Sequence, residues 1–363
     1  MNNKKIVILG GARDYHVMDW YRTIRSLVPN RDVKILTDLI GGEGFDVIAN
    51  EKDKIENLFI IDNFLLSKQS RLGNIWRNIF KLLVLPIQIF YLKKYVSKNT
   101  NTVYHAQPMY YMLLCWLSGM KFIGTPQGSE ILVRPVNSKL YKFLAIKILQ
   151  NAKYITVDSL SMQKKIYELS GVEALVIQNG IDIQGLSKYI NKNQKREKIT
   201  SIRGMTDLYR IDEILRSKNS SQCKIPINFI YPFGEESYKI DVVSNFTEED
   251  NDLGRLNKEN MYELLSKTKL VISIPKSDSS PRSVYESIFL GAVVAITYNG
   301  YYDVLPKCMK DRIYIVDLEN DNWYDEAVKF SDKISSNHYL PSQEALEMFD
   351  QNISMQKVIE KLY

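Results

Sequence analysis

Two carboxylates that could hold the two ends of one ligand, Asp278 and Glu286, have seven residues between them. Asp278 stands in a Ser- and Pro-rich loop, 275–281, which cannot easily continue a strand. Glu286 belongs to the helical pattern behind that loop, and Gly291 ends the pattern. Paired carboxylates also serve acid–base catalysis, but that role requires a particular gap between them, which a sequence does not specify.

Apolar runs at 270–274 and 293–297 flank this loop and helix and are typical of strands. Together the four elements form a βαβ unit, whose ligands bind where the loop meets the helix N-terminus. The amides and the dipole of the first helical turn attract an anion there, most often a phosphate. We therefore expect an anionic ligand at Ser279, Ser280, Pro281, Arg282 and Ser283. The competing interpretation is an ordinary βαβ unit with a solvated Asp278 and a surface Glu286.

Two arginines, Arg203 and Arg210, follow the apolar run that begins at Ile199. A guanidinium binds a diphosphate through two parallel hydrogen bonds, so both are candidates for the same anion. For Arg210 a plain surface role is the alternative.

Gly10 and Gly11 follow a predicted strand, 6–9, and precede an amphipathic helix. The stretch lacks the full G-x-G-x-x-G spacing, so it does not indicate a dinucleotide site. The two glycines either let the backbone approach a ligand or form a tight turn only.

The triplet Asp250-Asn251-Asp252 has the form of a metal-binding D-x-D motif. It stands in an acidic loop with no strand directly before it, so we interpret it as solvated. The sequence therefore gives no reason to expect a metal ion.

At 363 residues, with apolar runs alternating with helical stretches, the chain predicts an α/β protein of two domains with mostly parallel sheets. Residues 1–200 contain 29 Lys and Arg against 16 Asp and Glu, whereas the remainder contains 19 against 26. This asymmetry predicts two domains with different partners. Nucleic acid is not expected, because no zinc-finger, RRM-like or helix-turn-helix signature accompanies the basic half.

Residues 68–98 carry seven basic side chains and no acid, around an apolar stretch that contains Trp76 and Phe90. The apolar core, 82–92, is shorter than the roughly 18–20 residues that a membrane span needs. Basic residues around an apolar face predict a helix that lies on an anionic membrane surface, with Pro86 kinking or splitting it. A core helix with a solvated basic edge is the alternative.

The three cysteines are far apart in the sequence, and no signal peptide precedes the first predicted strand. We expect a cytoplasmic chain with reduced thiols, either free or peripheral at the inner face of the membrane.

Several of these motifs resemble the retaining family-4 glycosyltransferases of the GT-B fold. The run PRSVYESIFLGAVVAIT, 281–297, is similar to the family's helix after its E-x7-E region, with Asp278 in place of the first Glu. The segment 124–131 resembles the family's HGSDI stretch, with Gln127 where many relatives carry a sugar-contacting His. Because glutamine does not titrate near neutrality, we expect no general base at Gln127.

The resemblance implies two Rossmann-like domains facing across a cleft: an acceptor-binding domain, 1–187, and a nucleotide-sugar-binding domain, 188–341. A C-terminal helix, 342–363, either crosses back to the first domain or packs within the second. It implies donor contacts from Glu286 to the ribose, from Arg255 and Leu256 to the base, and from Gly10 and Gly11 to the phosphate. His105 and His16 are expected in either a structural or an acceptor-contact role.

The implied activity is transfer of a hexose-type sugar, with retention, from a UDP- or GDP-linked donor to a glycan or lipid-linked acceptor in bacterial surface polysaccharide assembly. Asp278 would bind the donor sugar, Arg203 and Arg210 the leaving diphosphate, and no cofactor or metal would be needed. Two alternatives remain: a GT-B sugar-nucleotide 2-epimerase, and a non-catalytic nucleotide-sugar-binding subunit of a polysaccharide complex.

Overall fold

The computed structural model describes the chain except for residues 1–3, 39–44, 46–47, 58–72, 191–194 and 335–336. It divides into two compact units: unit 1 comprises Met1–Asn179 and Gln351–Tyr363, and unit 2 comprises Gly180–Asp350. The division precedes the expected boundary after residue 187, because Ile181 and Leu186 are buried in the core of unit 2. The apolar run 58–61, which its sequence favours as a further strand, and the start of the basic segment, 68–72, lie outside the described residues.

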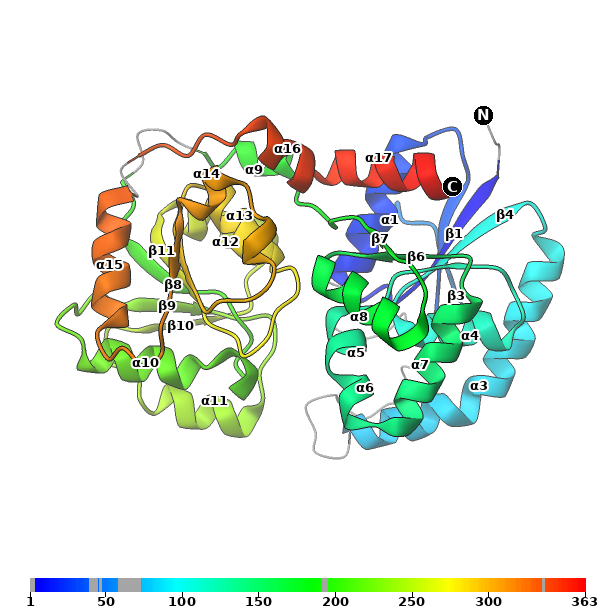
Figure 1. Cartoon of the computed structure of the whole chain (residues 1–363), viewed down its shortest axis with the longest axis horizontal. Coiled ribbons are helices and arrows are strands. Elements are labelled where there is room, and N and C mark those ends of the chain that lie inside the picture. The colour runs from blue at the N-terminus through cyan, green and yellow to red at the C-terminus, as the bar shows by residue number, and fades with distance from the viewer. Residues whose placement is uncertain (1–3, 39–44, 46–47, 58–72, 191–194, 335–336) are drawn as a thin grey trace. The chain divides into compact units, whose positions relative to one another are not determined.

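Unit 1 is built on a seven-stranded parallel sheet in the order β3-β2-β1-β4-β5-β6-β7 (Figure 1). The strands are β1 (Lys5–Leu9), β2 (Val33–Thr37), β3 (Ile55–Asn57), β4 (Thr102–Ala106), β5 (Ile123–Gly124), β6 (Tyr154–Val157) and β7 (Leu175–Val176). The helices are α1 (Tyr15–Leu27), α3 (Gly73–Lys98), α4 (Met109–Leu117), α5 (Gly128–Leu132), α6 (Arg134–Asn137), α7 (Lys139–Asn151), α8 (Leu160–Ser170) and α17 (Gln351–Leu362).

Alternation along the strands of unit 1 supplies two hydrophobic cores, one on each face of the sheet. In β1, Val7 and Leu9 pack with α4, α7 and α8, whereas Ile6 and Ile8 pack with α1 and α17. This arrangement follows from the period of two along a strand. The apolar run of β1 therefore serves both layers, as expected for a parallel sheet covered on both faces.

Unit 2 is built on a six-stranded parallel sheet in the order β10-β9-β8-β11-β12-β13. The strands are β8 (Lys198–Ser201), β9 (Ile227–Ile230), β10 (Asn251–Gly254), β11 (Thr268–Ser273), β12 (Val293–Ile296) and β13 (Ile313–Ile315). The helices are α9 (Ile183–Ser187), α10 (Ile211–Ser220), α11 (Glu236–Val243), α12 (Lys258–Ser266), α13 (Arg282–Phe289), α14 (Lys307–Lys310), α15 (Trp323–Ile334) and α16 (Gln343–Phe349), with 3-10 turns at Asp207–Tyr209 and Tyr302–Val304.

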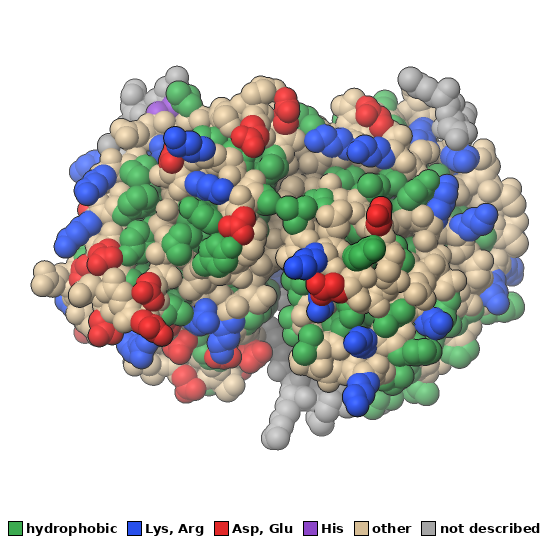
Figure 2. Space-filling view, viewed as in Figure 1, with side chains coloured by type: hydrophobic (Ala, Val, Ile, Leu, Met, Phe, Trp, Pro, Cys, Tyr) green, Lys and Arg blue, Asp and Glu red, His purple; other side chains and the backbone are tan. Residues whose placement is uncertain are grey.

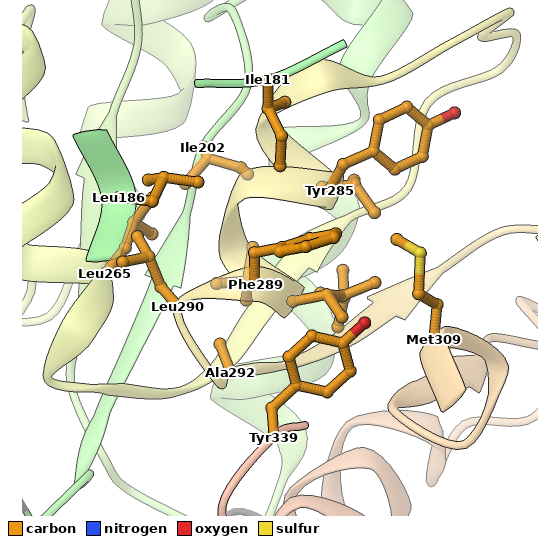
Figure 3. Packing of buried hydrophobic residues seen from close by; sticks show 14 of the residues in the cluster. Ile181, Leu186, Ile202, Leu265, Tyr285, Phe289, Leu290, Ala292, Met309 and Tyr339 are labelled. Atoms are coloured by element: carbon orange, nitrogen blue, oxygen red, sulfur yellow. The ribbon is translucent and has the colours of Figure 1, made fainter. Parts of the chain in front are cut away.

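Helix α13 is held by the hydrophobic core on one face of this sheet. Figure 3 shows Phe289 in the middle of that core, near Tyr285, Leu290 and Tyr339. Every residue of α13 from Val284 to Phe289 is buried. The start of this helix is therefore fixed relative to the strands on either side of it.

The expected C-terminal helix is two helices separated at Asp350. Ala345 and Phe349 of α16 pack in the core of unit 2, whereas Met355, Val358 and Leu362 of α17 pack in unit 1. A separate difference concerns α3, which continues through Pro86 as one helix. Pro86 lies on its exposed side, where water can bond the carbonyl that proline leaves without a donor.

Each sheet has a switch point, where consecutive strands begin to add in opposite directions. In unit 1 it lies between β1 and β4, and in unit 2 between β8 and β11. In open α/β sheets, ligands bind beyond the carboxyl ends of the strands at such a point.

Candidate functional site

Arg203 and Asp278 meet at the switch point of unit 2. Arg203 lies just beyond β8, and Asp278 lies in the loop that follows β11. The Arg203 Nη2 atom is 2.6 Å from Asp278 Oδ2, and Arg203 Nε donates to Ser273 Oγ at 2.6 Å. The structure thus brings together two residues that are 75 positions apart in the sequence.

The Arg203–Asp278 pair is partly accessible, with side-chain exposures of 12% and 16%. The guanidinium carbon also lies 5.7 Å from the centre of the Tyr209 ring. The two hydrogen bonds engage two of the five N–H donors that a guanidinium carries. The remaining donors are the ones that a bound anion could use.

The loop 274–281 is held by side chains from neighbouring segments. Asn299 Oδ1 accepts a hydrogen bond from the Asp278 amide at 3.0 Å, and Thr297 Oγ1 donates to the Pro275 carbonyl at 2.9 Å. Both residues follow β12, and the sequence reasoning did not single them out. The Asn299-Gly300 turn, after a predicted strand, is the sequence feature that points to this segment.

Arg210 also forms a hydrogen bond to the loop 274–281. Its Nη1 donates to the carbonyl of Ile274 at 3.1 Å, directly after β11. Its backbone has φ of 51°, a left-handed conformation that is uncommon outside glycine. The observed contact is to the loop backbone, so Arg210 positions the segment that carries Asp278.

Glu286 lies on α13 and is 5% exposed. Tyr262, on α12, donates its hydroxyl to Glu286 Oε1 at 2.7 Å, and Arg282 Nε is 3.7 Å from the same oxygen. Glu286 is therefore a buried, oriented carboxylate and not the surface residue of the competing interpretation. Tyr262 was not singled out by the sequence, because a tyrosine at helical spacing is typical of a core position.

The start of α13 carries the residues predicted to bind an anion. Pro281 occupies the N-cap and makes no side-chain cap, and its carbonyl accepts the amides of Val284 and Tyr285 at 3.0 and 3.3 Å. The amide of Ser283, one position earlier, has no acceptor within the helix. Ser279, Ser280, Pro281, Arg282 and Ser283 lie together in the loop and first turn, next to Asp278.

Tyr301 adds a buried hydroxyl that sequence reasoning missed. The residue is 2% exposed, and its hydroxyl has no hydrogen-bond partner among the residues that the structure describes. Burial raises the pKa of Tyr301, and the charges of Arg203 and Asp278 act on it in opposite directions. A buried hydroxyl without a partner costs free energy, so a ligand at the pair is a natural acceptor for it.

Arg255 and Leu256 follow β10, which is an edge strand of the sheet. Leu256 packs against the core that contains α13, and Arg255 is exposed. They precede α12, the helix that supplies Tyr262 to Glu286. Their expected contact with a base stays a prediction.

Asp250 is not solvated, contrary to the interpretation of the Asp250-Asn251-Asp252 triplet. It forms a fully buried ion pair with Lys218 at 2.6 Å and also accepts from the Ile227 amide at 2.9 Å. Burial would raise the pKa of Asp250, but these hydrogen bonds outweigh burial and hold it below the usual value. Asp250 therefore stabilises the fold from inside, whereas Asn251 and Asp252 lie in β10 and are exposed. No cluster of three or more His, Cys, Asp or Glu side chains suited to a metal ion occurs in the described part of the chain.

In unit 1, Gly10 lies at the switch point after β1. A Cβ atom at Gly10 would lie 2.5 Å from Val17 Cγ1 and 3.0 Å from the Gln107 carbonyl oxygen. At Gly11 the nearest atom would be 3.9 Å away. Gly10 is thus required by close packing, which is a sufficient reason for its presence.

Gln127 lies on the same edge of unit 1 and donates from Nε2 to Asp14 Oδ2 at 2.9 Å. Asp14 is the N-cap of α1, where its Oδ1 accepts the amide of His16 at 2.8 Å. Gln127 and His16 are both exposed. Asp14, which joins them, was not among the residues singled out by the sequence.

His105 is fully buried in β4. Its Nδ1 is 2.6 Å from the Tyr363 hydroxyl, and its Nε2 is 2.7 Å from Thr125 Oγ1. Burial lowers the pKa of His105 to about 3. Both ring nitrogens are occupied within unit 1, so of the two roles expected for His105 the structure favours the structural one.

No protein-family model matches the chain, and no curated protein matches it significantly. Solved structures do match its fold. HepE from Anabaena, in complex with UDP-glucose, superposes with a TM-score of 0.69 at 14% identity over 99% of both chains. Sucrose-phosphate synthase from Thermosynechococcus elongatus gives a TM-score of 0.73 at 12% identity over 98% of both chains. The lipopolysaccharide outer core galactosyltransferase WaaB gives 0.61 at 11% identity over 99% of this chain and 100% of that one.

These similarities, together with the two parallel sheets, confirm the predicted α/β class with two Rossmann-like domains of the GT-B fold. At such identities the likeness establishes the fold, and the activity is argued from the site.

Proposed function

We propose that the chain is a glycosyltransferase that moves a hexose-type sugar from a UDP- or GDP-linked donor to a glycan or lipid-linked acceptor, with retention and without a metal ion. The observation that carries this proposal is the accessible Arg203–Asp278 pair at the switch point, beside the start of α13. It is supported by the neighbours: HepE was crystallised with UDP and glucose, and WaaB is a galactosyltransferase of the lipopolysaccharide outer core. A role in bacterial surface polysaccharide assembly is part of the same proposal.

In this scheme the nucleoside diphosphate leaves with increased negative charge, which must be stabilised where it develops. The N–H donors of Arg203 that are not bound to Ser273 or Asp278 face this charge, together with the Ser283 amide and the dipole of α13. Arg210 donates a hydrogen bond to the Ile274 carbonyl and so fixes the position of the loop that carries Asp278.

The proposal assigns the remaining donor contacts to three further side chains. Glu286 receives Tyr262 on Oε1, so its other oxygen is the one assigned to the ribose hydroxyls. Asp278 accepts hydrogen bonds from the donor sugar, and Tyr301 donates its buried hydroxyl to the same ligand. The acceptor hydroxyl passes its proton to the leaving phosphate on the same face, so no dedicated base is needed.

A thermal-shift screen of UDP, GDP and their sugars on the purified chain tests the proposal. A nucleotide present at about 100 times its Kd adds roughly 2.7 kcal/mol to the free energy of unfolding, which is readily measured. The stabilising nucleotide sugar is then incubated with acceptor glycans or lipids and the products are separated.

If none of the nucleotides raises the melting temperature, the site is not a donor site. Formation of an epimer from the donor alone would instead identify an epimerase. Binding without hydrolysis or transfer would identify a non-catalytic subunit.

A further inference from the structure

Helix α3 exposes a continuous apolar face. Its buried side is formed by Val84, Gln88 and Leu92, at helical spacing. On the opposite side, among the side chains that the structure describes, the exposed apolar residues are Ile79 (46%), Leu82 (67%), Leu83 (65%), Ile87 (44%), Phe90 (64%) and Tyr91 (48%). Single exposed apolar residues are ordinary, but a contiguous row indicates a surface that binds something.

A second apolar row runs along α6 and α7, two helices separated at Ser138. Val133, directly before α6, Val136 on α6, and Leu140 and Phe143 on α7 are 42%, 73%, 70% and 55% exposed. Helices α3 and α7 both pack against α4 in the core on one face of the unit 1 sheet. Figure 2 shows hydrophobic and basic side chains together over this part of unit 1, where Figure 1 places α3, α6 and α7.

The charge around these two rows has one sign. Between residues 63 and 157 the sequence has 13 Lys and Arg and a single acid, Glu130. Glu130 is 3% exposed and caps α5 from inside, where it accepts the amides of Gln127 and Met109. Lysines at 93, 94, 98, 139, 142 and 147 are exposed next to the apolar rows.

We propose that the α3 and α6–α7 faces of unit 1 together bind an anionic lipid bilayer, with the apolar rows inserted at the interface and the lysines among the headgroups. Long lysine side chains can keep their charge at the headgroups while their stems lie along apolar surface. No described helix is long and apolar enough to cross the bilayer, so this contact lies in the plane of the membrane surface.

Charge decides between a bilayer and the other occupants of an apolar face. A second copy of the chain would bring two lysine-rich surfaces together, and like charges would oppose that contact. An anionic lipid surface instead attracts each lysine. The proposal does not depend on sugar transfer, since vesicle binding requires no nucleotide sugar.

The test is cosedimentation with vesicles of phosphatidylcholine containing phosphatidylglycerol, compared with phosphatidylcholine alone. The parent chain is expected on the anionic vesicles only. Lys93→Gln with Lys94→Gln should lower the partition coefficient about 25-fold, since each lysine near the surface contributes about fivefold. Leu83→Ser with Phe90→Ser should lower it roughly tenfold or more, because exposed apolar side chains lose their burial in the interface.

The matched control is Lys357→Gln with Lys361→Gln, which removes the same charge from exposed positions on α17, on the opposite face of the sheet. This control should bind as the parent does. The proposal is wrong if this control loses as much affinity as the α3 lysine variant. It is also wrong if the parent does not bind anionic vesicles. A parent that is dimeric by light scattering and becomes monomeric in the Leu83→Ser, Phe90→Ser variant would also overturn it, in favour of self-association.

Melting temperatures equal to that of the parent show that the variants are folded. Should the serine variant be unfolded, the lysine variant and its control still decide the matter, because exposed lysines leave the core unchanged.

Discussion

The switch points of the two units have the same topology and different contents. In unit 1, between β1 and β4, the space is filled from within: Gly10 packs on Val17 and on the Gln107 carbonyl, and His105 is buried against Tyr363. In unit 2, between β8 and β11, the corresponding place holds a partly exposed charged pair with a buried hydroxyl beside it.

Sheet topology therefore provides a potential binding site in each unit. The side chains of the loops at that site determine whether a ligand can bind there. In unit 1, the packing around Gly10 and the two hydrogen bonds of His105 occupy this region. In unit 2, Arg203 retains N–H donors beyond its hydrogen bonds to Ser273 and Asp278, and the proposed function assigns these donors to an anion. Substitutions in unit 1 should therefore act on stability, and those at the unit 2 pair on ligand affinity and rate.

The largest effect is expected for Arg203→Gln. The change removes the positive charge that the proposed function places against the leaving diphosphate, and loss of one such group costs about 100- to 1,000-fold in kcat. Steady-state sugar transfer measures it. Arg216→Gln is the matched control, because Arg216 is 72% exposed and pairs with the neighbouring Glu213. Equal activity of Arg203→Gln and the parent would remove Arg203 from the site.

A second contrast lies within unit 1, between Gly10→Ala and Gly11→Ala. The added methyl at Gly10 would overlap Val17 and approach a backbone oxygen, so it should lower the free energy of unfolding by about 3 kcal/mol, the upper end for overpacking. At Gly11 the methyl has room, and the effect should stay below about 1 kcal/mol. Urea denaturation measures both, and equal losses would contradict the packing argument.

The buried His105 should make unit 1 sensitive to acid. The unfolded chain takes up a proton on this imidazole below its ordinary pKa, whereas the folded chain does so only near its lowered pKa of about 3. Stability is therefore present above the unfolded pKa of about 6.5 and is lost as the pH falls, by about 2 kcal/mol between pH 7 and pH 5. Denaturation at the two pH values should show a smaller loss in His105→Asn. If the stability of parent and variant depends on pH in the same way, the folded chain protonates the His105 ring as readily as the unfolded chain does.

The smallest effect is also the most diagnostic. Tyr301→Phe deletes the buried hydroxyl that lacks a partner in the described chain, so it should leave stability unchanged or raise it by about 1 kcal/mol. The same change should weaken binding of the nucleotide sugar about fivefold, since one hydrogen bond contributes about 1 kcal/mol. Isothermal titration calorimetry measures the affinity, and thermal melting measures the stability. A fall in stability with unchanged affinity would assign the hydroxyl to the fold and not to the ligand.

The sequence by itself determined the class of fold and one end of the candidate site. The apolar runs and their breaks specify strand and helix order, because burial on both faces of a parallel sheet requires nearly continuous apolar strands. The Asp278–Glu286 spacing and the helix that Gly291 ends are local features, and local features can be inferred from neighbouring residues.

Only the tertiary structure decided which distant residues share the site and which are part of the frame. Asp278 contacts Arg203 because β8 and β11 are adjacent in the sheet. The order of strands in a sheet cannot be inferred from any short segment of the sequence. The same holds for Asp250, which is buried against Lys218 of α10, and for His105, which is buried against Tyr363. A carboxylate or an imidazole has no fixed role until the fold sets its neighbours and its access to water.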